Sequence, residues 1–333
     1  MHKSDLNWRR FLLTGLAFLI FFPLVAQRCD DPIKIIILGS STSYGNGASK
    51  SENSFVSHYT KFLKDSVNSQ CDIVNLSFPG FTSYKVQPDG FRPPQKRASS
   101  KPDTSKNISK AIKSKPDAVI INLPTNDAES QFSIEETSAN FLRITNLLEE
   151  ANIHYWVTTA QPRNFDGNSN ELKNKKKDLL KAFNTFVKHT YPSNNLDFFT
   201  ILADSVGNIK PELNSGDGIH LNDSGHLLLS KILVSRNISH SICQGKKRLK
   251  QLVANNFIIT NLPFNDNLLV YFEMGMSNNY SIEISDMFGK VIFYDEQRLQ
   301  IPIEINSSTL PKGIYQLKII SNEKRVIILR LMK

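Results

Sequence analysis

The sequence predicts a three-layer α/β/α domain on a doubly wound parallel sheet, followed by a small antiparallel β-sandwich. Two observations favour this fold class. Over the first two thirds of the chain, apolar runs of strand length alternate with amphipathic helical segments, and the crossovers are long enough for parallel pairing. Beyond about Ser241 no long helical pattern is found, and short strand-like runs punctuated by turn residues replace it.

The first domain begins with a strand over Lys34–Leu38, where an apolar, β-branched run ends at Gly39. Such a run is typical of a strand buried on both faces of a parallel sheet. Apolar runs and helical periodicity then predict three more strands and five helices, in alternation. The strands are Cys71–Leu76, Ala118–Leu123 and Ile153–Thr159; the helices are Ser54–Val67, Lys106–Lys113, Ile134–Ala151, Leu172–His189 and Ser224–Val234, the last of this domain.

The second domain is predicted at residues 257–333, after a basic linker at 241–256. It contains no histidine and no cysteine, so we expect it to be a non-enzymatic appendage. Turn residues such as those around Gly289 and Gly313 separate its predicted strands. These strands are Leu268–Phe272, Tyr280–Ser285, Val291–Tyr294, Ile301–Ile305, Tyr315–Ser321 and Arg325–Leu331.

The net charge of +9 on 333 residues does not indicate a nucleic-acid partner. The basic residues concentrate in three stretches that carry no interleaved aromatic residues and no nucleic-acid-binding motif. These stretches are Lys96–Lys115, Lys173–Lys177 and Lys246–Lys250, and we interpret them as solvated loops and helix faces.

The N-terminus predicts export. Basic residues precede the apolar run Phe11–Val25, which ends at the small residue Ala26, as in a secretory signal peptide covering residues 1–26. A retained membrane anchor is disfavoured because the run is short and contains Pro23. A lipoprotein signal at Cys29 is disfavoured because Arg28 precedes it. We therefore expect a secreted or cell-surface protein, exported through the periplasm, with no stable membrane span once the signal is removed.

The three cysteines, Cys29, Cys71 and Cys243, lack the paired short spacings of a zinc site, so no metal is expected. In an oxidising compartment two of them can form a disulfide and leave one over. The spacing does not choose the pair.

Polar residues follow the predicted strands at the edge where open α/β sheets bind their ligands. Ser41 follows the first strand, Gly80 the second and Asn126 the third, while Asp217 and His220 precede the last helix. This is the inventory for acyl transfer without a cofactor. Ser41 is the candidate nucleophile, His220 its base and Asp217 the carboxylate that orients the base. The Ser41 and Gly80 amides and the Asn126 side chain are the candidate oxyanion donors.

These blocks, in this order, resemble the SGNH (GDSL-type) hydrolase family of esterases and lipases over about Ile33 to Leu233. The resemblance implies the flavodoxin-like fold of that family over residues 30–240 and the same five residue roles. The sequence departs from the family pattern twice, with Ser40 in place of an aspartate and Pro124 in place of a glycine. Asp127 is interpreted as structural and His226 as a non-catalytic residue of the last helix.

The C-terminal segment resembles the sorting domain of cargo for the type IX secretion system of Bacteroidota. The residues that carry this resemblance are Pro263–Asn267, Ile284–Lys290, Leu310–Tyr315 and the basic ending Lys324–Lys333. It implies contact with the secretion machinery and release or attachment at the cell surface.

We therefore expect a secreted serine esterase that acts on a small ester or an acetylated glycan, with carbohydrate acetates favoured. A lipase or lysophospholipase-type activity and acyl transfer are alternatives within the same chemistry. A non-catalytic carbohydrate-binding surface protein on a hydrolase scaffold is the alternative from another class. The polar insertion Tyr84–Lys106 is expected to border the site.

Overall fold

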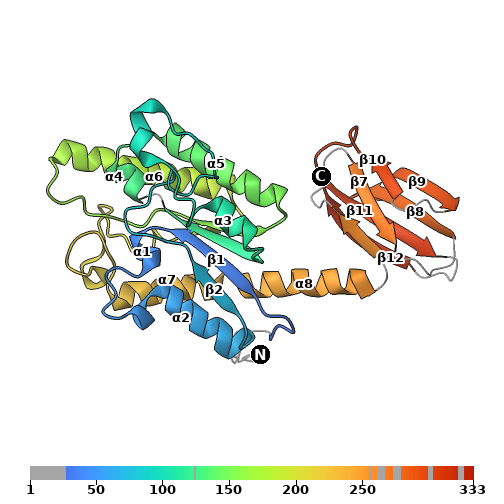
Figure 1. The fold of residues 1–333 in the computed structure, drawn as a ribbon, viewed down its shortest axis with the longest axis horizontal. Coiled ribbons are helices and arrows are strands. Elements are labelled where there is room, and N and C mark those ends of the chain that lie inside the picture. Colours follow the sequence, from blue (N-terminus) through green and yellow to red (C-terminus); the bar gives the residue numbers. More distant parts are fainter. Residues whose placement is uncertain are drawn as a thin grey trace, which may run out of the picture.

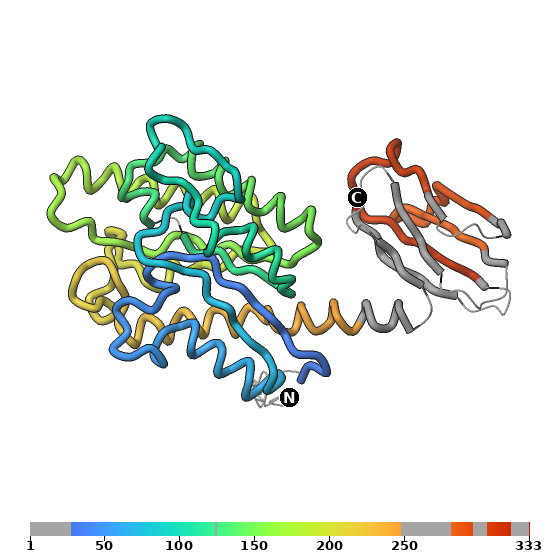
Figure 2. Tube along the Cα trace, viewed as in Figure 1, coloured from blue at the N-terminus to red at the C-terminus, as the bar shows by residue number. Residues whose placement is uncertain are grey.

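The structure, a computed structural model, describes residues 28–333 except 124, 255–256, 261–266, 273–278, 299–302 and 322–325. The predicted signal peptide lies outside the described residues, as does Pro124. Figure 1 shows the α/β domain, with helices on both sides of its sheet, and Figure 2 traces the same path along the chain.

A five-stranded parallel sheet forms the centre of the first domain, in the order β2-β1-β3-β4-β5. This is the flavodoxin-like strand order, whose switch point lies between β1 and β3. The strands are β1 Lys34–Gly39, β2 Asp72–Asn75, β3 Ala118–Asn122, β4 His154–Thr158 and β5 Asn195–Leu196. Four of the five were predicted within two residues at each end. β5 was missed because a two-residue strand carries no periodicity.

The two faces of β1 alternate between two apolar cores. Ile35 and Ile37 pack in one core with residues of α2, α7 and α8, while Ile36 and Leu38 pack in the other with residues of α3, α5 and α6. The two helix layers are visible on either side of the sheet in Figure 1. The α-helices are α1 Ser41–Tyr44, α2 Phe55–Phe62, α3 Ile108–Lys113, α4 Thr125–Glu129, α5 Ile134–Glu150, α6 Asn170–Thr190, α7 Asp223–Ser235 and α8 Ile238–Ala254.

Short 3-10 and π segments complete the first domain, and side-chain caps begin most of the longer helices. The short segments are η1 Ser51–Asn53, η2 Leu63–Val67 (a π-helix that continues α2), η3 Gln95–Ser100 and η4 Pro211–Leu213. The caps are Ser54, Asn107, Ser133, Ser169 and Asn222, each of which accepts a backbone N–H of the first turn.

The prediction that the helix at Ser224–Val234 is the last of this domain is wrong. Helix α8 follows α7 almost at once and covers most of the range expected to be a linker. Ile238 and Ile242, one turn apart on α8, are fully buried in the same core as α2 and α7. The glycine and the basic run after Ser241 hid this helix in the sequence, since both suggest a solvated loop.

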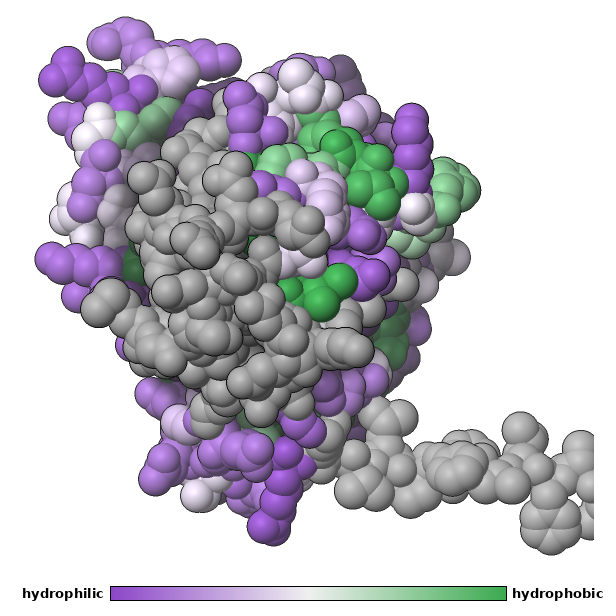
Figure 3. All heavy atoms as spheres, turned by 90° about the vertical axis from the view of Figure 1, so that its right-hand side faces the viewer, coloured by the Kyte–Doolittle hydropathy of each residue, from purple (hydrophilic) through white to green (hydrophobic). Residues whose placement is uncertain are grey.

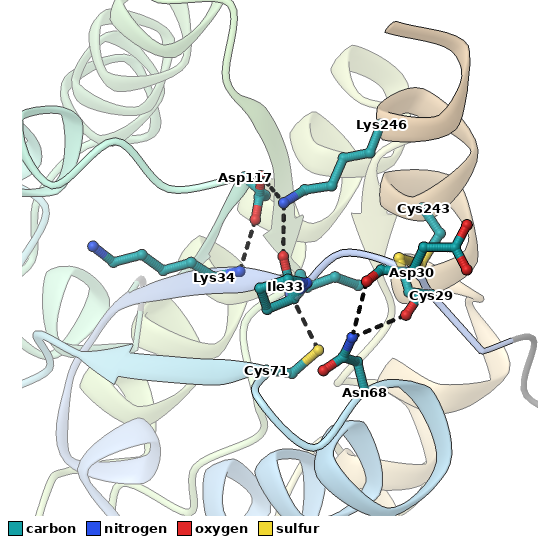
Figure 4. Close-up of a disulfide and its surroundings, with 10 residues drawn as sticks. Cys29, Asp30, Ile33, Lys34, Asn68, Cys71, Asp117, Cys243 and Lys246 are labelled. Carbon is teal, nitrogen blue, oxygen red and sulfur yellow. Dashed lines mark hydrogen bonds and ion pairs between the residues drawn. A yellow bond between two sulfur atoms is a disulfide. The ribbon is translucent and has the colours of Figure 1, made fainter. Parts of the chain in front are cut away.

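A disulfide between Cys29 and Cys243 joins the start of the described chain to α8 (Figure 4). Cys71 remains a free, buried thiol, and its sulfur accepts the Ile33 N–H at 3.2 Å. The expectation of one disulfide and one remaining cysteine is therefore confirmed, and the structure identifies the pair.

Lys246, one turn beyond Cys243 on α8, adds a second attachment next to the disulfide. Its Nζ lies 2.8 Å from Asp117 Oδ1 and donates to the Pro32 carbonyl at 2.7 Å. Asp117 in turn accepts the Lys34 N–H at 2.7 Å. Pro32 and Lys34 lie at or just before the start of β1, and Asp117 lies just before β3. The disulfide and the ion pair therefore attach α8 to the amino edge of the sheet (Figure 4).

The C-terminal segment forms two antiparallel sheets, of order β10-β7-β6 and β12-β11-β8-β9. Its strands are β6 Phe257–Thr260, β7 Asn267–Phe272, β8 Asn279–Asp286, β9 Val291–Arg298, β10 Ile303–Asn306, β11 Ile314–Ser321 and β12 Val326–Met332. The six predicted strands are found, together with β6, which was not predicted. On the molecular face drawn in Figure 3, hydrophilic side chains dominate the described surface and apolar ones form only small areas. Within the described part of the chain, every helix is too short or too polar to cross a membrane.

Candidate active site

Ser41 begins α1 directly after the carboxyl end of β1. The chain can turn there because residue 39 is glycine: a Cβ at that position would lie 2.5 Å from Ser43 Oγ and 2.6 Å from Ser77 Oγ. Ser41 is half-buried. Among the described residues, neither its hydroxyl nor its main-chain N–H has a hydrogen-bond partner, as expected of a first-turn amide.

Two backbone hydrogen bonds connect this turn to the loops after the neighbouring strands. The Gly39 carbonyl accepts the Phe78 N–H at 3.2 Å, and the Ser40 N–H donates to the Asn122 carbonyl at 3.2 Å. Asn122, the last residue of β3, also accepts the Ser43 hydroxyl at 2.8 Å. The segments at the carboxyl ends of β1, β2 and β3 therefore meet at one edge of the sheet.

Gly80 lies in the loop after β2, and Asn126 lies on α4, which follows β3. Gly80 is exposed, has a φ of +78°, and its N–H has no partner among the described residues. Asn126 Nδ2 donates to the Phe81 carbonyl at 2.9 Å, which fixes the amide beside the Gly80 turn; its second N–H has no partner within the described parts of the chain. The positive φ of Gly80 explains the glycine, since other residues are strained in that region.

Asp127, the next residue on α4, is buried and bonds to the loop that contains Gly80. Its Oδ1 accepts the Ser83 N–H at 2.8 Å. Burial raises the pKa of this carboxyl to about 7, against the lowering effect of the hydrogen bonds from Ser83. This placement fits the structural role predicted for Asp127.

Asp217 and His220 form a directly bonded pair on the loop before α7. His220 Nδ1 lies 2.6 Å from Asp217 Oδ2, and Asp217 Oδ1 accepts the backbone N–H of His220 at 2.8 Å. Because Nδ1 carries the proton that faces the carboxylate, the neutral ring presents an unprotonated Nε2. Partial burial alone would raise the pKa of Asp217, but hydrogen bonds from His220 and Ile219 hold it well below its usual range.

Ser41 and His220 share no hydrogen bond in the part of the chain that the structure describes. Their connection runs through the turn at Gly45–Gly47, which we call the spacer turn. The Gly45 and Asn46 N–H groups both donate to the Ser41 carbonyl, at 3.1 and 2.9 Å. Gly47 lies against His220, whose Cβ is 2.8 Å from the position that a Cβ on residue 47 would take. A hydrogen bond between a catalytic serine and its histidine often forms only when substrate binds. Its absence is therefore compatible with the candidate roles of Ser41 and His220.

Two exposed aromatic side chains border the same edge, and the sequence analysis did not single them out. Tyr44 on α1 is 56% exposed and Phe78 after β2 is 46% exposed, with their ring centroids 6.2 Å apart. Lys106, at the end of the polar insertion, has its Nζ 5.9 Å from the Phe78 ring centroid. An aromatic residue three positions after the candidate nucleophile, and another two before the glycine donor, were the available signals.

Across the described ranges, no group of three or more histidine, cysteine, aspartate or glutamate side chains is placed to hold a metal ion. His226 is buried on α7, as the sequence interpretation placed it.

Comparison with known proteins identifies the class to which this fold and site belong. Residues 37–228, more than half of the chain, match the model of the GDSL-like lipase/acylhydrolase family. The chain belongs to this family, and it is a hydrolase of ester bonds. The five-stranded parallel sheet confirms the predicted fold class. No curated protein matches the chain.

Several solved structures are similar to this chain. A GDSL-like lipase from Bacteroides thetaiotaomicron is 16% identical, with a TM-score of 0.45, over 62% of this chain and 88% of its own. A psychrotrophic esterase from a Pseudoalteromonas species is 19% identical, with a TM-score of 0.42, over 61% and 95%. A lipase from a goat rumen metagenome is 17% identical, with a TM-score of 0.45, over 61% and 97%.

Residues 262–332 match the model of a secretion system C-terminal sorting domain. The protein is therefore exported, to the cell surface or beyond the cell, and its second domain contacts the secretion machinery. This confirms the localisation and the sorting domain expected from the sequence.

Proposed function

We propose that this hydrolase is a serine esterase in which Ser41, His220 and Asp217 form the catalytic triad. The observation that carries the proposal is the Asp217–His220 pair. Its 2.6 Å contact fixes the ring tautomer and leaves Nε2 available as a base at the edge of the sheet where Ser41 begins α1.

In acylation, His220 Nε2 takes the proton of the Ser41 hydroxyl as Oγ attacks the ester carbonyl. The bond to the alcohol oxygen breaks, and the same proton passes from Nε2 to the departing alcohol. Water, deprotonated by Nε2, then attacks the acyl carbonyl. The bond between the acyl carbon and Ser41 Oγ breaks, Nε2 returns the proton to Oγ, and the acid leaves. Asp217 stays ionised throughout, because its hydrogen bonds hold its pKa well below neutral pH. The carboxylate therefore stabilises the imidazolium that forms twice in each cycle.

The oxyanion of each tetrahedral intermediate would accept hydrogen bonds from the Ser41 and Gly80 main-chain N–H groups and from the free N–H of Asn126. Support for this role comes from their hydrogen bonding: both main-chain groups lack a partner among the described residues, and Asn126 uses one of its two amide hydrogens. A donor that needs no rearrangement stabilises the transition state most.

For the substrate, we favour a small acyl group, such as acetyl, on a carbohydrate alcohol. Tyr44 and Phe78 support this choice, since exposed rings beside a reacting centre offer a flat apolar surface to the C–H face of a sugar. The Lys106 ammonium beside Phe78 would donate to a hydroxyl of the same ring.

The test compares the purified protein with its Ser41→Ala variant on p-nitrophenyl acetate and on acetylated sugars. We expect turnover by the wild-type protein and a loss of at least 10³-fold in the variant. Equal rates in the two proteins would refute the triad.

Specificity is tested with Phe78→Leu, which keeps an apolar side chain but removes the ring. Leu142→Ala, an exposed apolar position on α5, is the matched control. We expect Phe78→Leu to lower kcat/KM for sugar acetates about tenfold and to leave that for ethyl acetate within a factor of two. A preference for long-chain esters in all variants would refute the carbohydrate assignment.

A further inference from the structure

The spacer turn separates the two groups that must exchange a proton. On one side, the Gly45 and Asn46 N–H groups hold the Ser41 carbonyl. On the other, Gly47 contacts His220 and Leu221 so closely that a Cβ at residue 47 would lie 2.3 Å from the Leu221 carbonyl oxygen. A shift of this turn therefore changes the distance between Ser41 and His220 directly.

His226 holds the spacer turn in place from the first turns of α7. Its ring is fully buried and stacks on Phe55, with ring centroids 6.2 Å apart and planes 14° apart. Nδ1 accepts the Phe55 N–H, at the start of α2, at 3.3 Å, and Nε2 lies 3.1 Å from the Asn46 carbonyl. Since Nδ1 is an acceptor, the proton of the neutral ring must lie on Nε2, which donates to Asn46.

We propose that His226 is a positioning residue for catalysis: through Asn46 it fixes the spacer turn and so sets the geometry between Ser41 and His220. This inference rests on the proposed triad. The path is short, running from the His226 Nε2–H to the Asn46 carbonyl, from the Asn46 N–H to the Ser41 carbonyl, and from Gly47 to His220. An error of about 1 Å between reacting groups can cost about 10²-fold in rate.

The bond from the Phe55 N–H requires a neutral ring, whereas the Nε2–H donor to Asn46 is present in both protonation states. Protonation would place a hydrogen on Nδ1 and break the bond from the Phe55 N–H. Burial lowers the pKa of His226; the Asn46 carbonyl and Asp223 on α7 oppose this effect, and His58 on α2 and His220 reinforce it. Burial therefore favours the neutral ring that the bond from Phe55 requires.

Two substitutions separate the catalytic contact from the structural one. His226→Gln places an amide N–H where Nε2 lies, so it keeps the donor to Asn46 and loses the acceptor for Phe55. His226→Asn places an oxygen where Nδ1 lies, so it keeps the acceptor for Phe55 and loses the donor to Asn46. Each variant loses one buried hydrogen bond, and we expect similar losses of stability.

Esterase assays on both variants then test the inference. We expect kcat to fall 10- to 100-fold in His226→Asn and to stay within about threefold in His226→Gln, with KM little changed in both. Equal kcat losses in the two variants, in proportion to their stability, would overturn the inference.

Crystal structures of the variants give a readout that does not depend on turnover. The inference expects the Asn46–Gly47 segment and the Ser41–His220 separation to move in His226→Asn and to stay in place in His226→Gln. An unmoved segment in both variants would also overturn it. Absence of esterase activity in the wild-type protein would instead refute the proposed function, and the structural comparison would still decide whether His226 positions the turn.

Discussion

Removal of the Cys29–Cys243 disulfide should destabilise the hydrolase domain without changing its chemistry. The two cysteines are 214 residues apart in sequence, so the crosslink closes a loop that contains nearly the whole domain. The change to make is the double substitution Cys29→Ser and Cys243→Ser. Its expected effect is large because a long closed loop removes much of the conformational freedom of the unfolded chain.

The magnitude follows from the loop length. The chain-entropy relation, with a constant of about 2.1 cal/mol/K and a term of 1.5R ln n, gives about 5 kcal/mol at 25 °C for the 214-residue separation. Measured disulfides contribute about 2–4 kcal/mol. The Lys246 contacts with Asp117 and Pro32 and the buried Ile238 and Ile242 remain in the variant. We therefore expect a loss of about 3–5 kcal/mol with α8 still in place.

Trp156 makes the assay specific to this domain. It is buried in β4, and the only other tryptophan, Trp8, lies in the predicted signal peptide. Urea unfolding followed by Trp156 fluorescence should show the midpoint falling by about 1–2 M, since the urea slope is about 3 kcal/mol per M for a domain of this size. Cys71→Ser, a change of the same type at the buried free thiol, is the matched control and should cost far less.

The kcat of the folded variant should equal that of the wild-type protein. Cys29 precedes β1 and lies at the amino edge of the sheet, whereas Ser41 follows β1 at the carboxyl edge. A stability loss below about 1 kcal/mol would contradict the entropic argument. A change in kcat without partial unfolding would contradict the separation of the two edges.

Three further predictions concern the carboxyl edge. Gly47 has a φ of +90°, and a Cβ at this position would lie 2.3 Å from the Leu221 carbonyl oxygen. Gly47→Ala should therefore lower kcat about 10²-fold while circular dichroism shows a folded protein. An unchanged kcat would exclude a role for the spacer turn. Asp217→Asn should lower kcat about 10⁴-fold in steady-state assays, because the amide no longer fixes the ring tautomer of His220, and a loss below tenfold would argue against the triad. For Asp127, burial raises the pKa to about 7, so the unfolded chain releases this proton before the folded protein does and stability falls as pH rises from about 4 to 7. Urea titrations across this range should show less of that fall in Asp127→Asn, and parallel pH profiles for the two proteins would contradict the assignment.

The sequence allowed some elements of the sheet and the candidate site to be placed, but not all of them. β1 and β3 could be placed from apolar runs because strands buried on both faces leave a continuous signal. The candidate Ser41, Asn126 and His220 could be placed because they follow strands or precede a helix at the ligand edge. α8 was not predicted because its glycine and its basic run suggest a solvated loop; Ile238 and Ile242, one turn apart, were the available signal.

The arrangement between Ser41 and His220 could not be predicted, for a physical reason. Their separation depends on contacts to two backbone groups, the Asn46 carbonyl and the Ser41 carbonyl. Every residue type carries a backbone carbonyl, so the sequence does not show which of them are bonded. A histidine that bonds two main-chain atoms looks like any core histidine in the sequence. The cysteine pairing was open for a related reason, because three cysteines allow three pairs and only the fold brings Cys29 to Cys243.

The two edges of the sheet differ in what their residues do: the carboxyl edge carries the candidate catalytic groups, and the amino edge carries contacts that stabilise the fold. Catalysis by the proposed triad needs unpaired donors and a base with a free nitrogen. Among the described residues, the Ser41 and Gly80 amides and His220 Nε2 at the carboxyl edge have no hydrogen-bond partner. The amino edge carries a disulfide and a half-buried ion pair at Lys246, which use no group that the reaction needs. Because the disulfide acts on the unfolded chain as a whole, stability gained at one edge supports the open polar groups at the other. An exported enzyme can use this solution, since the oxidising conditions outside the cytoplasm let the crosslink form.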